Sequence, residues 1–314
     1  MNLPTPPILF IIFNRADLTS RVFERIREQR PGQLFIAADG PRTSKPDELN
    51  HCSETREVTR NIDWPCEVHR LERDVNLGCK IGVSSAISWF FEHVEQGIIL
   101  EDDCLPDATF FPYCSELLER YRYETKVGLI GSNQFCPKSE RPNYSSSYYF
   151  SKYPHIWGWA TWRRVWQNYD VNIKNWTCDR KSLSSISNPR VRKHFASRFD
   201  RVYSGAKDIW GFQLVHLCLS SGLLAINPIV NLVENIGFDE RATHTNKSDH
   251  NQIIPKTESM LFPLSHPNEI KADQKSDLFT ETFVCMVPPN NWVAFLWSLR
   301  KRMRKLNKML FHET

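Results

Sequence analysis

The chain has 314 residues, of which 41% are hydrophobic and 24% are charged, a composition typical of a globular protein with a substantial core. The formal net charge is +4, and much of the positive charge lies in one C-terminal segment, 300–308. Because the rest of the chain is close to neutral, the charge distribution excludes a nucleic-acid-binding surface that extends over the whole protein.

Segments typical of strands and helices alternate over residues 8–130. Short apolar runs predict strands that are buried on both faces, and apolar residues at helical spacing predict helices between them. The predicted strands are 8–13, 34–38, 67–71, 97–100 and 127–130. The predicted helical faces are Leu18, Val22 and Ile26, then Val83, Ala86, Ile87, Phe90, Phe91 and Val94, and last a stretch from the N-cap Asp107 to Tyr121. This order predicts an α/β fold with a mixed, largely parallel sheet flanked by helices.

The pattern changes in the second half of the chain. Residues 135–180 are rich in Tyr, Trp, Ser and Asn. Helices are predicted at 190–203 and 212–221, and an extended stretch at 226–233. Residues 239–280 are polar and predicted to be rich in loops.

Three acids, Glu101-Asp102-Asp103, directly follow the predicted strand 97–100. Side chains alternate along a strand, so Glu101 and Asp103 are expected to face one way and Asp102 the other. Open α/β sheets bind ligands at the carboxyl ends of their strands, and carboxylate oxygens suit Mg²⁺ or Mn²⁺. The triplet therefore predicts a metal site completed by water and phosphate oxygens. The alternative is a solvated acidic loop.

Three other motifs are predicted to lie at the same edge of the sheet. Asp39-Gly40 ends a strand, and its carboxylate could accept hydrogen bonds from a nucleobase or ribose, with a simple turn as the alternative. Asn14-Arg15 follows the first strand and could reach a base or a phosphate. Asn76-Leu77-Gly78 precedes a helix, where backbone N–H groups can bind an anion.

Two residues further along the chain are candidates for chemistry. Asp208 stands beside Ile209-Trp210, and an acid near an apolar surface can act as a general base. The alternative is that Asp208 is the N-cap of the helix that follows it. His244, in a polar stretch, could be a metal or phosphate ligand supplied by a loop, or simply an exposed histidine.

With these motifs assembled, the sequence resembles the nucleotide-diphospho-sugar transferases of GT-A fold, especially the bacterial hemolytic-protein-like glycosyltransferases. It is also distantly similar to N-acetylglucosaminyltransferase I. The likeness spans about residues 7–246. The motifs that carry it are Pro7-Ile8-Leu9, Asn14-Arg15, Ala38-Asp39-Gly40-Pro41, Asn76-Leu77-Gly78, Ile99-Leu100-Glu101-Asp102-Asp103, Trp157-Gly158-Trp159-Ala160-Thr161-Trp162, Asn231-Leu232-Val233-Glu234-Asn235-Ile236-Gly237-Phe238 and Ala242-Thr243-His244-Thr245.

The resemblance implies that Asp103 holds a metal ion, Mn²⁺ or Mg²⁺, while Glu101 and Asp102 support the metal site and the ribose. It implies that Arg15 and Asp39 bind the nucleotide. It also implies that the aromatic segment 157–162 lies on the acceptor side, together with Trp210 near Asp208. These acceptor-side residues are Trp157, Trp159, Trp162 and Trp210.

The resemblance also implies that residues 235–244, including His244, close over the donor. In relatives an acid often directly follows the Trp of the base motif, whereas this chain has Gly211 there. Asp208 is the acid that remains nearby, so it is the expected base of an inverting transfer.

The expected function is metal-dependent transfer of a sugar from a nucleotide-diphospho-sugar to a glycan or glycolipid acceptor, in bacterial surface polysaccharide assembly. A nucleotidyltransferase of related fold is one alternative, but it requires a Gly-rich loop after the first strand, and residues 14–19 contain no Gly. A non-catalytic, membrane-peripheral carbohydrate-binding protein is the other alternative.

The end of the chain predicts a basic amphipathic helix. Its apolar face would consist of Trp292, Phe295, Leu296, Leu299, Met303, Leu306 and Leu310. Six basic residues between 300 and 308 flank this face, which is typical of a helix that lies in an anionic membrane surface. An ordinary docked helix is the alternative. The predicted domains are therefore a GT-A-like domain, 1–265, and a polar linker with the basic helix, 266–314.

The nine cysteines are scattered and form no CxxC pair, which argues against a zinc site and for free thiols. Residues 1–7 lack the features of a signal peptide, and no apolar stretch is long enough to span a bilayer. A cytoplasmic location is expected, with peripheral association at the inner face of the membrane.

Overall fold

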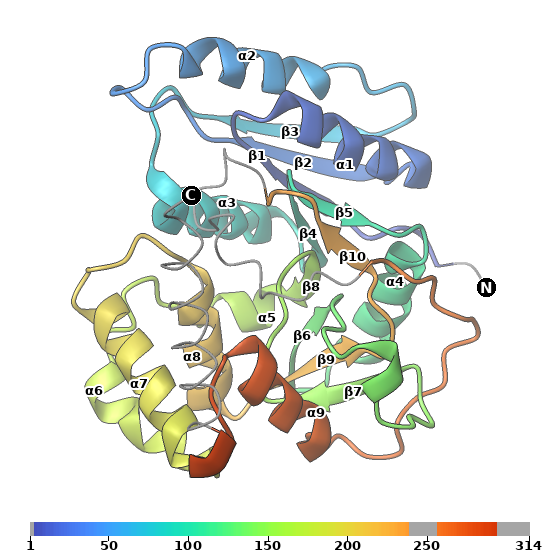
Figure 1. Cartoon of the computed structure of the whole chain (residues 1–314). Helices are drawn as coiled ribbons and strands as arrows, with labels where there is room; N and C mark the ends of the chain where they lie inside the picture. The colour runs from blue at the N-terminus through green and yellow to red at the C-terminus, as the bar shows by residue number, and fades with distance from the viewer. Residues whose placement is uncertain (1–2, 239–255, 294–314) are drawn as a thin grey trace, which may run out of the picture.

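The computed structural model describes residues 3–238 and 256–293, and an eight-stranded sheet forms its centre (Figure 1). The strands follow the order β3-β2-β1-β4-β8-β6-β9-β7 across the sheet. Six of them run in one direction, whereas β8 and β7 run antiparallel to their neighbours. The expected mixed, largely parallel α/β sheet flanked by helices is confirmed.

In the first half of the chain, the strands of this sheet coincide with the apolar runs of the sequence. They are β1 (Ile8–Ile12), β2 (Gln33–Ala38), β3 (Glu67–Glu72), β4 (Gln96–Glu101), β6 (Val127–Gly131), β7 (Tyr148–Ser151), β8 (Trp159–Trp162) and β9 (Leu224–Pro228). Ile8, Leu9 and Phe10 of β1 are fully buried, as expected for a strand covered on both faces. A separate antiparallel pair consists of β5 (Cys104–Pro106) and β10 (Val233–Asn235).

The longest helices bury the faces that their apolar spacing predicts. The helices are α1 (Ala16–Gln29), α2 (Glu48–Val58), α3 (Gly78–His93), α4 (Phe110–Arg120), α5 (Arg163–Trp166), α6 (Trp176–Asp179), α7 (Pro189–Tyr203), α8 (Gly211–Ser221) and α9 (Gln274–Phe279). Leu18, Val22 and Ile26 of α1 are buried, and so is the predicted face of α3. A second apolar cluster joins α6, α7 and α8, at the lower left of Figure 1.

Several elements differ from the sequence-based expectation. Helix α2 was not predicted, because its buried residues are Glu48, Cys52 and Thr55 rather than large apolar side chains. The N-cap of α4 is Thr109, and Asp107 instead accepts a hydrogen bond from the Thr109 backbone N–H at 2.9 Å. The extended stretch 226–233 is divided between β9 and β10, which belong to different sheets.

The segment after residue 265, expected to begin a polar linker, carries α9 and lies against the strand β7 (Figure 1). Asp277 of α9 accepts a hydrogen bond from the Ser151 hydroxyl at 2.6 Å, and the Tyr153 hydroxyl donates to Glu281 at 2.6 Å. The predicted boundary at residue 265 stays a prediction, and the basic helix at 294–314 lies outside the described residues. In the described ranges, no helix has the length and apolarity to cross a bilayer.

The order of the strands creates a crevice between β1 and β4. The chain builds β1, β2 and β3 to one side and then returns to place β4 on the other side of β1. Such a reversal separates the connections that follow neighbouring strands, so a crevice opens at their carboxyl ends. Residues 13–15 follow β1, and β4 ends at Glu101 and is followed by Asp102 and Asp103, so both strand ends carry predicted binding motifs.

Candidate active site

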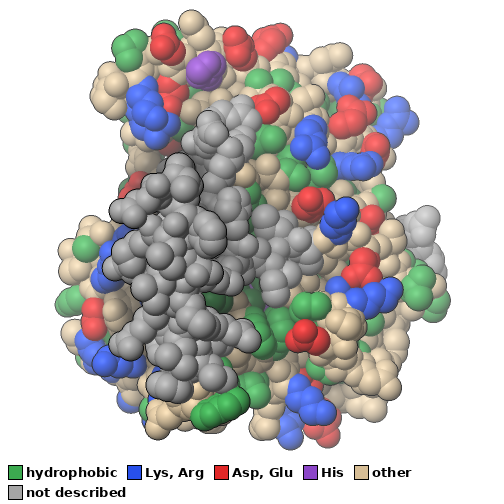
Figure 2. All heavy atoms as spheres, viewed as in Figure 1, with side chains coloured by type: hydrophobic (Ala, Val, Ile, Leu, Met, Phe, Trp, Pro, Cys, Tyr) green, Lys and Arg blue, Asp and Glu red, His purple; other side chains and the backbone are tan. Residues whose placement is uncertain are grey.

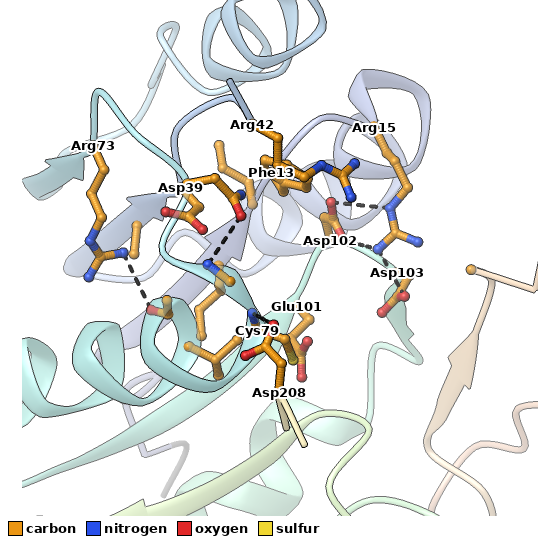
Figure 3. Close-up of a pocket in the computed structure, with 18 of the residues that line it drawn as sticks. Phe13, Arg15, Asp39, Arg42, Arg73, Cys79, Glu101, Asp102, Asp103 and Asp208 are labelled. Atoms are coloured by element: carbon orange, nitrogen blue, oxygen red, sulfur yellow. Dashed lines mark hydrogen bonds and ion pairs between the residues drawn. The ribbon is translucent and has the colours of Figure 1, made fainter. Parts of the chain in front are cut away.

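A pocket of about 350 Å³ lies at the carboxyl ends of β1, β2, β3 and β4 (Figure 3). Its volume is within the range of small-molecule sites. Each of the four strands contributes at least one charged side chain from the residues that follow it or end it. These side chains are Arg15 after β1, Asp39 after β2, Arg73 after β3, and Glu101, Asp102 and Asp103 at the end of β4.

Arg15 lies against the acid triplet. Its Nη2 pairs with Asp102 and donates to Asp103 Oδ2 at 2.9 Å, and its Nε donates to Asp102 Oδ2 at 3.4 Å. The strand β4 ends at Glu101, and residues 102–103 form a turn, so the alternation expected for a strand does not extend over the whole triplet. All three acids therefore line the same pocket.

The carboxylates of the triplet carry more negative charge than Arg15 can balance. Burial, together with repulsion from Asp103 and Asp102, raises the pKa of Glu101 to about 8. Burial also raises the pKa of Asp102 to about 6, against the attraction of Arg15. Burial alone would lower the pKa of Arg15, but Asp102 and Asp103 raise it above its ordinary value. The charged form of Glu101 is therefore disfavoured beside the other two carboxylates.

The carboxylate oxygens of the triplet suit a Mn²⁺ or Mg²⁺ ion that takes most of its other ligands from water and from the phosphates of a bound nucleotide. Mg²⁺ commonly takes one or two carboxylates from a protein and completes its shell with water and phosphate oxygens. Glu101 and Asp103 can supply those carboxylates from the pocket wall. Among the residues described, no group of three or more His, Cys, Asp or Glu side chains is arranged to hold a metal ion by itself. The predicted ligand His244 lies outside the described residues.

Backbone N–H groups at the N-terminus of α3 donate to side-chain oxygens of the protein itself. The backbone N–H of Leu77 donates to Asp39 Oδ2 at 3.0 Å, and Gly78 N–H donates to Asn76 Oδ1 at 3.1 Å. Burial raises the pKa of Asp39, while the N–H groups of Leu77 and Gly40 lower it. The anion-binding role expected for Asn76 and Gly78 is thus partly taken by intramolecular groups, although both residues line the pocket.

Asp208 also caps α3. Its Oδ2 accepts from the Cys79 N–H at 3.0 Å and its Oδ1 from the Lys80 N–H at 2.8 Å. It is therefore not the cap of the next helix, α8, whose N-cap is Trp210. Gly78 has φ +76° and a Cβ there would lie 2.7 Å from Asp208 Oδ2, so only glycine allows this approach. Asp208 and Glu101 both line the pocket (Figure 3).

Arg42 and Phe13 form a part of the pocket that the sequence did not indicate. The Arg42 guanidinium lies over the Phe13 ring, 5.3 Å from its centroid, and both residues line the pocket. Glu48, which is buried, pairs with Arg42 and also accepts from Arg42 N–H at 2.8 Å and from Asn14 Nδ2 at 2.9 Å. Asn14, expected to bind the nucleotide, does not line the pocket and instead helps to hold Glu48. Glu48 belongs to α2, and because that helix was not predicted from the sequence, this arrangement was not predicted either.

The expected acceptor-side tryptophans occupy different places. Trp157 lines the pocket, where its ring lies 5.7 Å from that of Phe238. The other three, Trp159, Trp162 and Trp210, are 1%, 2% and 5% exposed and belong to the core. Trp159 stacks on Trp210 with centroids 5.8 Å apart. Within the described residues, Trp157 is thus the one of the four placed to touch a ligand in the pocket.

The segment that follows β10 crosses the acid triplet. Ile236 N–H donates to the backbone carbonyl of Asp103 at 2.8 Å. A Cβ on Gly237 would lie 2.3 Å from Asp103 Oδ2 and 2.8 Å from Arg15 Nη1, so this glycine packs directly on the ion pair. Gly237 and Phe238 therefore complete one wall of the pocket.

Buried amides hold this wall in place. Asn133, which is fully buried, accepts from the Trp157 N–H at 3.2 Å and donates to the Val233 carbonyl at 3.0 Å. It thereby links the loop that carries Trp157 to the strand β10.

Outside the pocket, acidic and basic side chains are intermixed over the described part of the face in Figure 2.

Comparisons with known proteins reveal only distant likeness. No protein-family profile and no curated protein sequence matches the chain. Among solved structures, TarS from S. aureus is similar with 8% identity and a TM-score of 0.40, over 73% of this chain and 59% of that one. A cytidylyltransferase from Leptospira borgpetersenii has 11% identity and a TM-score of 0.31, over 66% of this chain and 74% of that one. HddC from Yersinia pseudotuberculosis has 10% identity and a TM-score of 0.30, over 53% and 81%.

Proposed function

We propose that this protein is a glycosyltransferase that moves a sugar from a nucleotide-diphospho-sugar to an acceptor hydroxyl with the help of Mn²⁺ or Mg²⁺. The observation that carries the proposal is the acid triplet at the crevice between β1 and β4, where Arg15 leaves negative charge unbalanced. A divalent cation there would neutralise the departing nucleoside diphosphate, where charge develops during transfer.

The remaining roles are those that the resemblance of the sequence implies, and they fall on side chains that line this pocket. Asp103 and Glu101 would hold the metal, and Asp102 would support the ribose side of the site. Arg15 and Asp39 would bind the nucleotide, and Trp157 would face the acceptor. Asp208, whose carboxylate uses one hydrogen bond to each oxygen, has lone pairs left to accept the proton of an attacking hydroxyl. Direct attack by that hydroxyl would invert the anomeric configuration.

The resemblance of the sequence supports a role in bacterial surface polysaccharide assembly, with a glycan or glycolipid as acceptor. The same resemblance and the basic tail support a protein at the inner face of the membrane. A nucleotidyltransferase remains the competing activity, and it differs in its products. A glycosyltransferase releases a nucleoside diphosphate from a nucleotide sugar, whereas a nucleotidyltransferase consumes a nucleoside triphosphate and releases pyrophosphate.

A panel of nucleotide sugars tests the proposal. Binding with Mn²⁺ is expected to raise the melting temperature for one donor, because a ligand that binds only the folded state stabilises it by mass action. The same donor is expected to be hydrolysed slowly to nucleoside diphosphate in a metal-dependent manner. Pyrophosphate release from a nucleoside triphosphate and a sugar phosphate, with no donor hydrolysis, would instead identify a nucleotidyltransferase.

Asp103→Asn connects this activity to the triplet. The loss of one carboxylate ligand is expected to reduce metal-dependent release by roughly 10³-fold or more, measured by nucleoside diphosphate production. Asp63→Asn is the matched control, because Asp63 is an exposed aspartate in a surface pair with Arg27. Full activity in the Asp103 variant would exclude the triplet as the metal site.

A further inference from the structure

Positive charge is concentrated in the part of the chain that forms α6, the 3-10 helix η2 (Arg180–Ser185) and α7. Residues 176–203, called the basic lobe below, contain seven Lys or Arg residues and two Asp, a net charge of +5. Residues 300–308 carry a further +6, so all other residues together carry −7, because the whole chain has +4. The basic residues of the lobe are Arg180, Lys181, Arg190, Arg192, Lys193, Arg198 and Arg201.

Four of these cations line one groove of about 550 Å³ on the surface of the lobe. Two of them come from η2 and two from α7, and they are Arg180, Lys181, Arg192 and Lys193. The apolar side chains of α7, such as Val191 and Phe195, pack into the second apolar cluster. This packing fixes the helix with its basic side at the groove.

Few acids balance the charge of this groove. Arg180 pairs with Asp200, whereas Arg192 donates to two backbone carbonyls, which carry no net charge. Lys181 and Lys193 are exposed, and among the residues that the structure describes neither lysine pairs with an acid. The groove therefore presents uncompensated positive charge to its surroundings.

The described part of the chain ends beside the basic lobe. At the start of α7, Arg190 contacts Asn291, and Val287 packs into the second apolar cluster. Next to these contacts, Met286 and Trp292 are 52% and 69% exposed. Exposed apolar and aromatic side chains beside cations are typical of a surface that lies in a membrane interface.

We propose that the basic lobe is a membrane-contact surface, which binds an anionic lipid bilayer together with the C-terminal segment. None of its seven cations is buried, so they suit an extended anionic surface better than a single enclosed phosphate. The described residues that line the active-site pocket all lie outside the lobe. In Figure 1, α6 and α7 lie at the lower left and β1, β2 and β3 at the top, so the pocket stays accessible when the lobe faces a bilayer.

This inference rests on the membrane association proposed above for the tail, and it adds a second contact in the folded domain. The tail offers six basic residues, and the groove offers two lysines without an acid partner. The tail thus supplies most of the affinity, and the lobe alone is too weak to hold the protein on vesicles. Because both contacts belong to one chain, their effects on affinity multiply, and the lobe sets the orientation of the domain.

Neutral substitutions in the full-length protein test the contact. Lys181→Gln with Lys193→Gln is expected to lower partitioning onto phosphatidylglycerol-containing vesicles roughly 10- to 30-fold at low salt, since two cations near the surface are lost. Sedimentation over a range of lipid concentrations measures this partitioning. Lys45→Gln with Lys126→Gln is the matched control, because it removes the same charge from exposed lysines outside the lobe and is expected to change partitioning little.

Hydrogen exchange locates the contact without any substitution. Backbone amides of residues 180–193 are expected to exchange more slowly when the full-length protein is bound to vesicles, because the bilayer covers them. Donor hydrolysis in solution is expected to be unchanged in the lobe variant, since its two lysines do not line the active-site pocket.

Equal partitioning of the lobe variant and the control variant, without slower exchange at 180–193, would overturn the lobe contact and leave the tail as the anchor. Absence of sedimentation by the full-length protein would remove both contacts, while donor hydrolysis would still support the transferase. Unchanged vesicle binding of the lobe variant, with weaker binding to a soluble acidic polysaccharide, would assign the lobe to an anionic glycan and would also overturn the lipid contact.

Discussion

At the scale of the residue, Asp208 combines two possible tasks. Its carboxylate accepts hydrogen bonds from the backbone N–H groups of Cys79 and Lys80, so it links the segment before α8 to the first turn of α3. The same residue lines the pocket. Substitutions can separate a capping role from a catalytic role, since the first affects stability and the second affects rate.

Asp208→Asn is expected to retain the donor-induced increase in melting temperature and to lose transfer by about 10²- to 10⁴-fold, because an amide cannot accept the proton of the acceptor. Asp170→Asn is the matched control. Asp170 also accepts two backbone N–H groups, those of Asn172 and Lys174, but it does not line the pocket. A loss of transfer below tenfold would assign the base to another acid, with Glu234 tested next.

At the scale of the element, α2 connects a structural helix to the pocket. Its first residue, Glu48, pairs with Arg42, and Arg42 in turn lies over Phe13 at the pocket wall. Although burial raises the pKa of Glu48, the hydrogen bonds and charge of Arg42 bring this pKa below its ordinary value. The helix therefore stabilises the wall through a charge that is present at neutral pH.

Glu48→Gln is expected to lower the free energy of unfolding by about 2 kcal/mol at pH 7, because the variant leaves Arg42 without its buried partner. A lowered pKa in the folded state means that the stabilisation is complete above the unfolded pKa of about 4.3 and is lost as the pH falls below it. Urea unfolding at pH 7 and at pH 3.5 measures both effects.

The difference between the Glu48→Gln variant and the unsubstituted protein should therefore shrink at the lower pH. Glu54→Gln, at an exposed position of the same helix, is the control and should change stability little at either pH. An equal loss of stability at both pH values would show that the charge of Glu48 is not what stabilises the wall.

At the scale of the whole molecule, the basic C-terminal segment is predicted from its sequence to bring the protein to an anionic membrane surface. The described chain ends close to α7, where Arg190 contacts Asn291 and Val287 packs into the second apolar cluster. A truncation after Pro289 keeps Val287 and removes the predicted amphipathic helix. The folded domain is therefore expected to survive this truncation.

The full-length protein is expected to sediment with anionic liposomes at low salt, and the protein truncated after Pro289 is expected to stay in solution. Each Lys or Arg near an anionic surface contributes about 1 kcal/mol, so the six basic residues of 300–308 could hold the protein there. High salt and uncharged vesicles are the controls, and both should reduce sedimentation. Equal sedimentation of the two proteins would exclude the tail as the anchor.

The sequence by itself determined the framework of the site. The apolar runs of β1, β2 and β4 predicted buried strands, because a strand covered on both faces needs apolar residues in succession. The residues at their ends, Arg15, Asp39 and the triplet 101–103, were consequently placed at one edge. Both features are local, because an apolar run and the residues that directly follow it can be recognised within a few positions of the sequence.

Only the tertiary structure decided which groups contact one another. Arg15 and Asp102 are separated by 87 positions, and Cys79 and Asp208 by 129, so no local pattern relates them. Asn14 was expected at the ligand but contacts Glu48 of α2, a helix without apolar periodicity. Hydrophobic patterns select secondary structure, whereas the partner of a charged side chain depends on how the strands are ordered and where the chain crosses back over them.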